Sequence, residues 1–94
     1  MKIAWTQLAL KDLNQVWDYI GADQPKAAEG VMESIAKAVE SLLSYPNLGR
    51  PGRVKGTREL VVVGTPFIVP YRIKKERIEV LAVIHGSRRW PQSL

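Results

Sequence analysis

The first half of the chain shows one short alternating segment followed by two apolar stripes of helical period. Apolar and polar residues alternate in KIAWT, residues 2–6, which predicts a strand. Thr6 is a suitable N-cap for the helix that follows, and Gly21 is a suitable end. One face of this predicted helix carries the apolar residues Leu10, Leu13, Val16, Trp17 and Ile20.

A second helix is predicted directly after the first. Asp23 or Gln24 can cap it, Pro25 suits its first turn, and the segment 45–47 (Tyr-Pro-Asn) ends it. Its apolar stripe consists of Ala28, Val31, Ile35, Ala38, Val39 and Leu42. Because only about four residues join the two helices, we expect an antiparallel helical hairpin.

In the second half the apolar period changes to two after a loop at residues 48–56, which holds three glycines and a proline. Three strands are predicted, at 57–63, 67–73 and 77–84, with short turns between them. Pro70 lies inside the second of these, which indicates a bulge or an unpaired side at that point. Both faces of the last strand are largely apolar, so we place it inside the sheet with helices on one side. The predicted order is β-α-α-β-β-β, an α+β fold with a helical hairpin packed on an antiparallel sheet.

Length and composition limit the class of protein. A chain of 94 residues with 46% apolar and 24% charged residues predicts one globular domain spanning 1–94. The absence of cysteine excludes disulfides, thiolate nucleophiles and cysteine metal sites, and with one histidine we expect no metal and no cofactor. The longest apolar candidate for a membrane span, residues 79–86, is far shorter than about 20 residues. We therefore expect a soluble, cytoplasmic protein without a membrane partner.

Charge is distributed unevenly along the chain. Residues 1–47 hold four Lys/Arg and six Asp/Glu, whereas residues 48–94 hold ten and three, so the halves carry −2 and +7. A basic half of this size attracts phosphates or an acidic protein partner. The alternative is charge that serves solubility alone.

Candidate chemistry gathers where the last predicted strand ends, in the segment HGSRRW at 85–90. A base, an acid and cations are what cleavage of an RNA backbone requires, and His85 with Arg88 or Arg89 offers these groups. A structural, hydrogen-bonded histidine is the alternative for His85. For Trp90 the alternatives are packing over the sheet edge and stacking on a base. The residues from Arg88 onward either fold onto the sheet or extend to a partner.

A second basic group lies in the glycine-rich loop and the strand after it. Arg50, Arg53, Lys55 and Arg58 could approach phosphate oxygens, but the loop lacks the GxxxxGK[ST] signature of nucleotide binding. A loop that is simply solvated is as good an interpretation as a loop that binds phosphate. Alternation places Arg58 on the face of Leu60 and Arg72 on the face of Ile68, and whether these faces coincide depends on the strand register. The helix carboxylates lie mostly on polar faces and form no catalytic pair.

Taken together, the blocks GRPGR, GTREL, GTPFIVPYR and HGSRRWP, preceded by WTQLALKDLNQVWDYI, make the chain resemble the RelE/ParE family of bacterial type II toxin–antitoxin toxins. The resemblance covers essentially the full chain. It implies a β-α-α-β-β-β fold and a toxin neutralised by a cognate antitoxin, with which it forms a hetero-oligomer.

Two activities occur among the members that the chain resembles. RelE-like members enter the ribosome and cut mRNA with basic residues on the sheet and an acid/base residue near the carboxyl terminus, whereas ParE-like members poison DNA gyrase. Arg88 and Arg58 match basic positions of the RNase group. Phe67 stands where that group carries a catalytic arginine, and no tyrosine follows Trp90. The paired helices resemble the ParE branch more closely.

The resemblance thus leads to a first hypothesis, a ParE-like gyrase inhibitor that blocks replication by binding. Its candidate target-binding residues are Arg50, Arg53, Arg58, Arg88, Arg89 and Trp90. The alternative is a ribosome-dependent mRNA endonuclease in which Arg58, Arg72 and Arg88 hold phosphate and His85 is the acid/base. A third hypothesis is a toxin-like domain that only binds its antitoxin.

Overall fold

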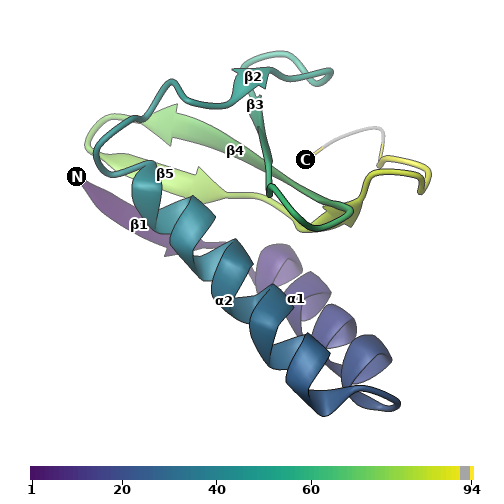
Figure 1. Cartoon of the computed structure of the whole chain (residues 1–94). Coiled ribbons are helices and arrows are strands. Elements are labelled where there is room, and N and C mark those ends of the chain that lie inside the picture. The colour runs from purple at the N-terminus through teal and green to yellow at the C-terminus, as the bar shows by residue number, and fades with distance from the viewer. Residues whose placement is uncertain (92–93) are drawn as a thin grey trace.

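The structure, a computed structural model, describes residues 1–91 and residue 94 and contains two helices and six strands in its described part (Figure 1). The first half holds β1 (Lys2–Trp5), α1 (Gln7–Gly21) and α2 (Pro25–Ser41). The second half holds β2 (Arg50–Pro51), β3 (Arg58–Val61), β4 (Phe67–Lys74), β5 (Arg77–Val80) and β6 (Ile84–His85). The predicted order of helices and main strands is confirmed.

The helical hairpin forms as the sequence predicts. The Thr6 hydroxyl accepts a hydrogen bond from the Ala9 amide at 3.1 Å and caps α1, which ends at Gly21. Gln24 occupies the N-cap position of α2, and Pro25 begins its first turn. The two helices lie side by side and run in opposite directions on one side of the sheet (Figure 1).

The sheet is mixed, which corrects the expected purely antiparallel arrangement. Its strand order is β1-β5-β4-β3-β2, with β6 paired to β4, and β1 pairs with β5 in parallel. The remaining pairs are antiparallel. The last predicted strand begins with β5, which lies between β1 and β4 and is therefore inside the sheet, as expected.

The predicted strand 77–84 is divided into β5 and β6, which corrects its length. Three residues, 81–83, lie opposite the two residues Val69 and Pro70, so the last strand has one extra residue at this point. Pro70 has no amide hydrogen, and its carbonyl accepts a hydrogen bond from the Leu81 amide at 2.9 Å. The bulge expected from Pro70 is confirmed.

The segment 48–56, predicted as a loop, contains the short strand β2, which is a third correction. Arg50 pairs with Glu59 and Pro51 with Arg58 at the edge of the sheet. Arg50 and Arg53 bind Glu59 across the turn, and the glycine and proline content of the segment did not indicate this pairing.

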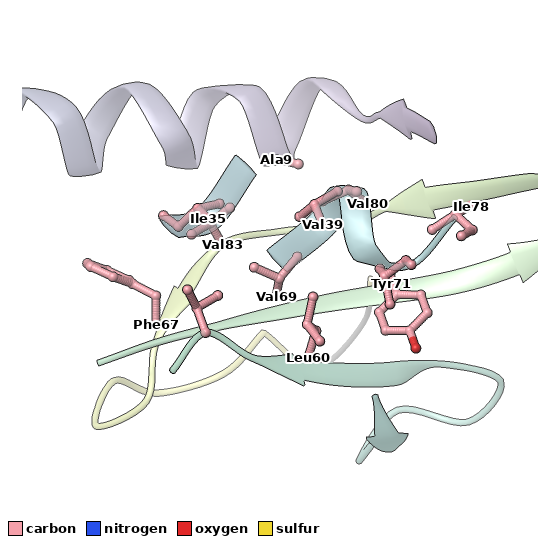
Figure 2. Packing of buried hydrophobic residues seen from close by; sticks show 12 residues of the cluster. Ala9, Ile35, Val39, Leu60, Phe67, Val69, Tyr71, Ile78, Val80 and Val83 are labelled. Carbon is pink, nitrogen blue, oxygen red and sulfur yellow. The ribbon is translucent and has the colours of Figure 1, made fainter. Parts of the chain in front are cut away.

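The core lies between the hairpin and one face of the sheet (Figure 2). Ile35 and Val39 of α2 pack toward Val69 and Tyr71 of β4, and all four are buried. The Tyr71 hydroxyl donates to the Pro46 carbonyl at 2.7 Å and accepts from the Gly49 amide at 2.9 Å. A Cβ at position 49 would lie 2.6 Å from Cε1 of the Tyr71 ring, so this close approach requires glycine. Tyr71 therefore holds the segment that leaves α2 against the sheet.

Replacement Tyr71→Phe tests this contact. We expect a loss of about 1–3 kcal/mol in the free energy of unfolding, because the buried Gly49 amide and Pro46 carbonyl lose their partner. Urea denaturation measures the loss. Tyr19→Phe is the matched control, since Tyr19 is 79% exposed, and equal stabilities of the two variants would contradict the assignment.

Candidate functional site

A groove of about 670 Å³ lies between α1 and the segment that ends the sheet. It exists because β1 ends at Trp5 and the chain turns into α1, so that within residues 1–91 β6 is paired with β4 alone. Its lining is mostly apolar on the helix side, where Asp12 and Gln15 are polar, and basic on the tail side. The lining includes Leu8, Val16, Tyr19, Phe67, Arg88 and Arg89.

His85, the candidate acid/base residue, also lines this groove. Its ring packs edge-to-face against Phe67 with centroids 5.7 Å apart, and Nδ1 lies 2.8 Å from the Ser87 hydroxyl. Phe67, which replaces the arginine expected in an RNase, is buried in the core. The ring of His85 is thus fixed by packing and by a neighbouring side chain, with Arg88 on the same groove.

Asp12 is a groove residue that the sequence analysis left among the helix carboxylates of the polar faces. Its carboxylate accepts a hydrogen bond from the Val83 amide at 3.0 Å, in the interruption between β5 and β6. Burial raises the pKa of Asp12, and the bond from Val83 partly opposes this effect. Its spacing of four residues from both Leu8 and Val16 was the signal for its place on the groove face.

A buried carboxylate organises the basic loop on the other side of the sheet. Glu59 is 3% exposed and accepts hydrogen bonds from Arg50 Nε and Nη2 at 3.2 and 3.1 Å. The Arg53 amide and Nε donate to its second oxygen at 2.8 and 3.2 Å. Burial by itself would raise the pKa of Glu59, but the hydrogen bonds from Arg53 and Arg50 outweigh it and lower that pKa. We call these three residues the Glu59 clamp.

The Glu59 clamp also contacts the tail. The Arg53 guanidinium carbon lies 3.7 Å from the centroid of the Trp90 ring, a cation–π contact. The tail therefore folds back onto the protein, which decides between the two arrangements left open by the sequence. Trp90 uses one face of its ring on Arg53, and packing is the role that the structure shows for it.

Arg58 and Arg72 lie on opposite faces of the sheet. Arg58 pairs with Tyr71 on the face toward the helices and donates to the Gly49 carbonyl at 2.6 Å. Arg72 pairs with Glu79 on the other face, and its Nε lies 2.6 Å from that carboxylate. Both border a shallow hollow of about 280 Å³. The hydrogen bond from Arg72, joined by one from Arg77, lowers the pKa of Glu79.

The proposed RNase residues fall into two separate places. His85 is opposite Phe67 and Arg58 is opposite Tyr71, so four residues of β4, about 13 Å, separate these positions. Arg88 joins His85 at the groove, whereas Arg72 joins Arg58 at the far hollow.

Neither a metal site nor a membrane-spanning helix is found among the described residues 1–91 and 94. No three His, Asp or Glu side chains there are grouped so that they could hold a metal ion. No helix in the same part of the chain has the length and apolar character needed to cross a membrane.

The fold and this site define a class of protein: a small α+β domain with a helical hairpin on one side of a mixed sheet and a basic surface on the other. The family model of the ParE toxin of the type II toxin–antitoxin system parDE matches residues 3–90. The chain belongs to this family, whose systems pair a toxin with an antitoxin.

Individual relatives agree with this assignment. A Sinorhizobium fredii protein named "Putative toxin Y4kP" is 47% identical over 93 residues, which are 99% of this chain and 96% of the relative. Toxin RelE2 of Caulobacter vibrioides is 34% identical, over 93% of this chain and 97% of its own length. A chain of the solved chromosomal ParDE TA system from P. aeruginosa superposes with a TM-score of 0.82 at 30% identity, covering 90% of this chain and 95% of that one.

Glu59→Gln tests the electrostatic role of the Glu59 clamp. Because the folded-state pKa lies below the ordinary 4.5, the carboxylate stabilises the fold above that value and loses this effect as the pH falls through the folded pKa. We expect the Tm of the variant at pH 7 to be roughly 5–10 °C below that of the unmodified chain. The difference should shrink below about pH 4.

The control for this comparison is Glu33→Gln, which removes the exposed ion pair with Lys37 on α2. Exposed pairs of this kind contribute little, so its Tm should stay near that of the unmodified chain. A Tm difference for Glu59→Gln that is constant from pH 7 to pH 3, followed by differential scanning fluorimetry, would contradict the role of its charge.

Proposed function

We propose that this chain is a ParE-like toxin that binds DNA gyrase and blocks replication, and that its cognate antitoxin neutralises it. The family membership and the ParDE structural relative support this proposal. The activity is binding without turnover.

The observation that carries the choice of target is the separation of the RNase candidates. Attack on an RNA backbone needs an acid, a base and cations around a single phosphate, within hydrogen-bond reach of it. His85 and Arg58 instead occupy register positions about 13 Å apart along β4, opposite Phe67 and Tyr71. Arg58 already donates to the Gly49 carbonyl, which gives it a structural task.

The candidate contact residues for the target also fall into two groups, those exposed at the groove and those engaged in contacts within the protein. Arg88 and Arg89 are exposed at the groove, where a partner can reach them. Arg50 and Arg53 are about half exposed, and each uses part of its guanidinium on Glu59. Trp90 is partly covered by Arg53. We propose Arg88 and Arg89 as direct contacts with the target, and Arg50, Arg53 and Trp90 as residues that hold the tail carrying them.

The groove beside α1 is our proposed docking site for the antitoxin. Leu8 and Tyr19 are exposed apolar side chains on its helix wall, and Arg88 and Arg89 line the opposite side. An amphipathic segment with apolar anchors and acidic neighbours fits this combination. The ParDE system of the structural relative supports an antitoxin as the partner.

The alternative is a RelE-like ribosome-dependent mRNA endonuclease. The 34% identity to Toxin RelE2 favours it, as does the position of His85 and Arg88 on one groove. In that case the tail side of the groove holds the mRNA, and the role of Phe67 in place of an arginine has to be explained.

Pulse labelling of DNA, RNA and protein synthesis after induction of the chain separates the targets. We expect DNA synthesis to fall first, and we expect His85→Ala to arrest growth as strongly as the unmodified chain, because binding needs no acid/base residue. Purified chain should inhibit DNA supercoiling by gyrase.

An early loss of translation, together with an inactive His85→Ala variant that keeps its Tm, would instead favour the endonuclease. Growth without arrest, combined with tight antitoxin binding, would identify a domain that only binds its antitoxin. Either result overturns the proposed gyrase inhibition.

Replacement Tyr19→Ala tests the docking site for the antitoxin. We expect the Kd for the co-encoded antitoxin to rise about tenfold, since a buried aromatic anchor typically contributes at least about 1.4 kcal/mol. Isothermal titration calorimetry measures the Kd. Tyr45→Ala is the matched control, as Tyr45 is 66% exposed and does not line the groove. Equal Kd values for both variants would place the antitoxin elsewhere.

A further inference from the structure

The face of the sheet turned away from the helices carries an ordered set of cations. Alternation along the strands and the cross-strand register place basic side chains there, together with the apolar Val61 and Ile68, whereas the side chains of the buried core point to the hairpin. We call this surface the basic face. It consists of Lys2, Arg50, Arg53, Arg72, Lys74 and Arg77, together with the carboxylates Glu59 and Glu79.

Each carboxylate of the basic face lies between two arginines. Glu59 binds Arg50 and Arg53, and Glu79 binds Arg72 at 2.6 Å and Arg77 at 2.7 Å. A guanidinium has five N–H donors, and these contacts use only some of them. The pairs therefore orient four guanidinium groups on the surface while leaving donors directed away from the carboxylates. Oriented guanidinium groups bind phosphate oxygens well because little side-chain entropy is lost.

Lys2, Arg77 and Lys74 form a row of cations at one end of the sheet, and their mutual repulsion lowers the stability of the folded protein. Lys2 pairs with Arg77, and Arg77 pairs with Lys74, so three cations stand side by side on adjacent strands about 4.8 Å apart. Like charges directly opposite one another destabilise a sheet. A polyanion bound across the row would remove this repulsion.

We propose that the basic face binds the phosphate backbone of duplex DNA. Sheet faces are broad and shallow, and Arg53 occupies one face of the Trp90 ring beside this one, which leaves unpaired bases little to stack on. Contacts to phosphates alone suit a duplex and do not depend on sequence. The choice of DNA over RNA rests on the proposed function, because gyrase acts on duplex DNA.

Binding of the purified full chain to a fluorescein-labelled 20-base-pair duplex tests the inference by fluorescence anisotropy over a range of salt concentrations. The test variant is Lys2→Ala/Lys74→Ala, and the control is Lys26→Ala/Lys37→Ala on α2, which removes the same charge from the opposite side. We expect the test variant to bind roughly tenfold more weakly and to reduce the salt slope by about 2. The control should keep both the affinity and the slope.

Several results would overturn the proposal. One is the absence of salt-dependent binding to the duplex. Another is an equal loss of DNA affinity in the two double variants. A third is a test variant that loses affinity for the antitoxin but not for DNA. The last result would assign the basic face to an acidic protein segment.

Gyrase supercoiling assays with the same proteins separate this inference from the proposed function. Gyrase inhibition by a chain that does not bind DNA would overturn the inference and leave the function standing. Binding of the duplex without any inhibition of gyrase would overturn the function and leave the inference standing.

Discussion

The α1–α2 hairpin covers one face of the sheet, and in the described part of the chain no helix lies over the other face (Figure 1). Strand alternation then gives neighbouring residues opposite environments, as Tyr71 and Arg72 show. Tyr71 is fully buried and holds the segment after α2, whereas Arg72 lies at the surface beside Glu79. Five of the ten basic residues of the second half therefore lie on the uncovered face, because burying unpaired charges under the helices would cost more than the packing gains.

Glu59 lies on the uncovered face but is itself buried by the loop above it. A buried carboxylate without partners would destabilise the fold, so Arg50 and Arg53 fold back over it with two guanidinium groups and one amide. These hydrogen bonds hold β2 beside β3 and place the Arg53 guanidinium against the Trp90 ring. The basic loop and the tail consequently depend on the same carboxylate, and the tail in turn carries Arg88 and Arg89 to the groove.

The sequence predicted elements whose signal is local. The caps and stripes of both helices and the Pro70 bulge follow from neighbours along the chain. The parallel pairing of β1 with β5 was missed because it joins residues about 75 positions apart, and no local pattern encodes it. The relative placement of Arg58 and Arg72 could not be predicted for the same reason. Alternation gave the face of each arginine within its own strand, but only the register between strands shows that the two faces are opposite. Glu59 was overlooked because its role comes from arginines of another segment.

The tail links the two surfaces for which we propose partners. Arg88 and Arg89 line the groove beside α1, and Trp90, the next residue, stacks on Arg53 of the basic face. A segment seated in the groove and paired with Arg88 and Arg89 would therefore restrain Trp90, and through it the guanidinium that Glu59 orients. In this arrangement an antitoxin need not cover the basic face in order to act on it. The three consecutive residues would connect the two surfaces, because Arg88 and Arg89 would contact the bound segment and Trp90 contacts Arg53.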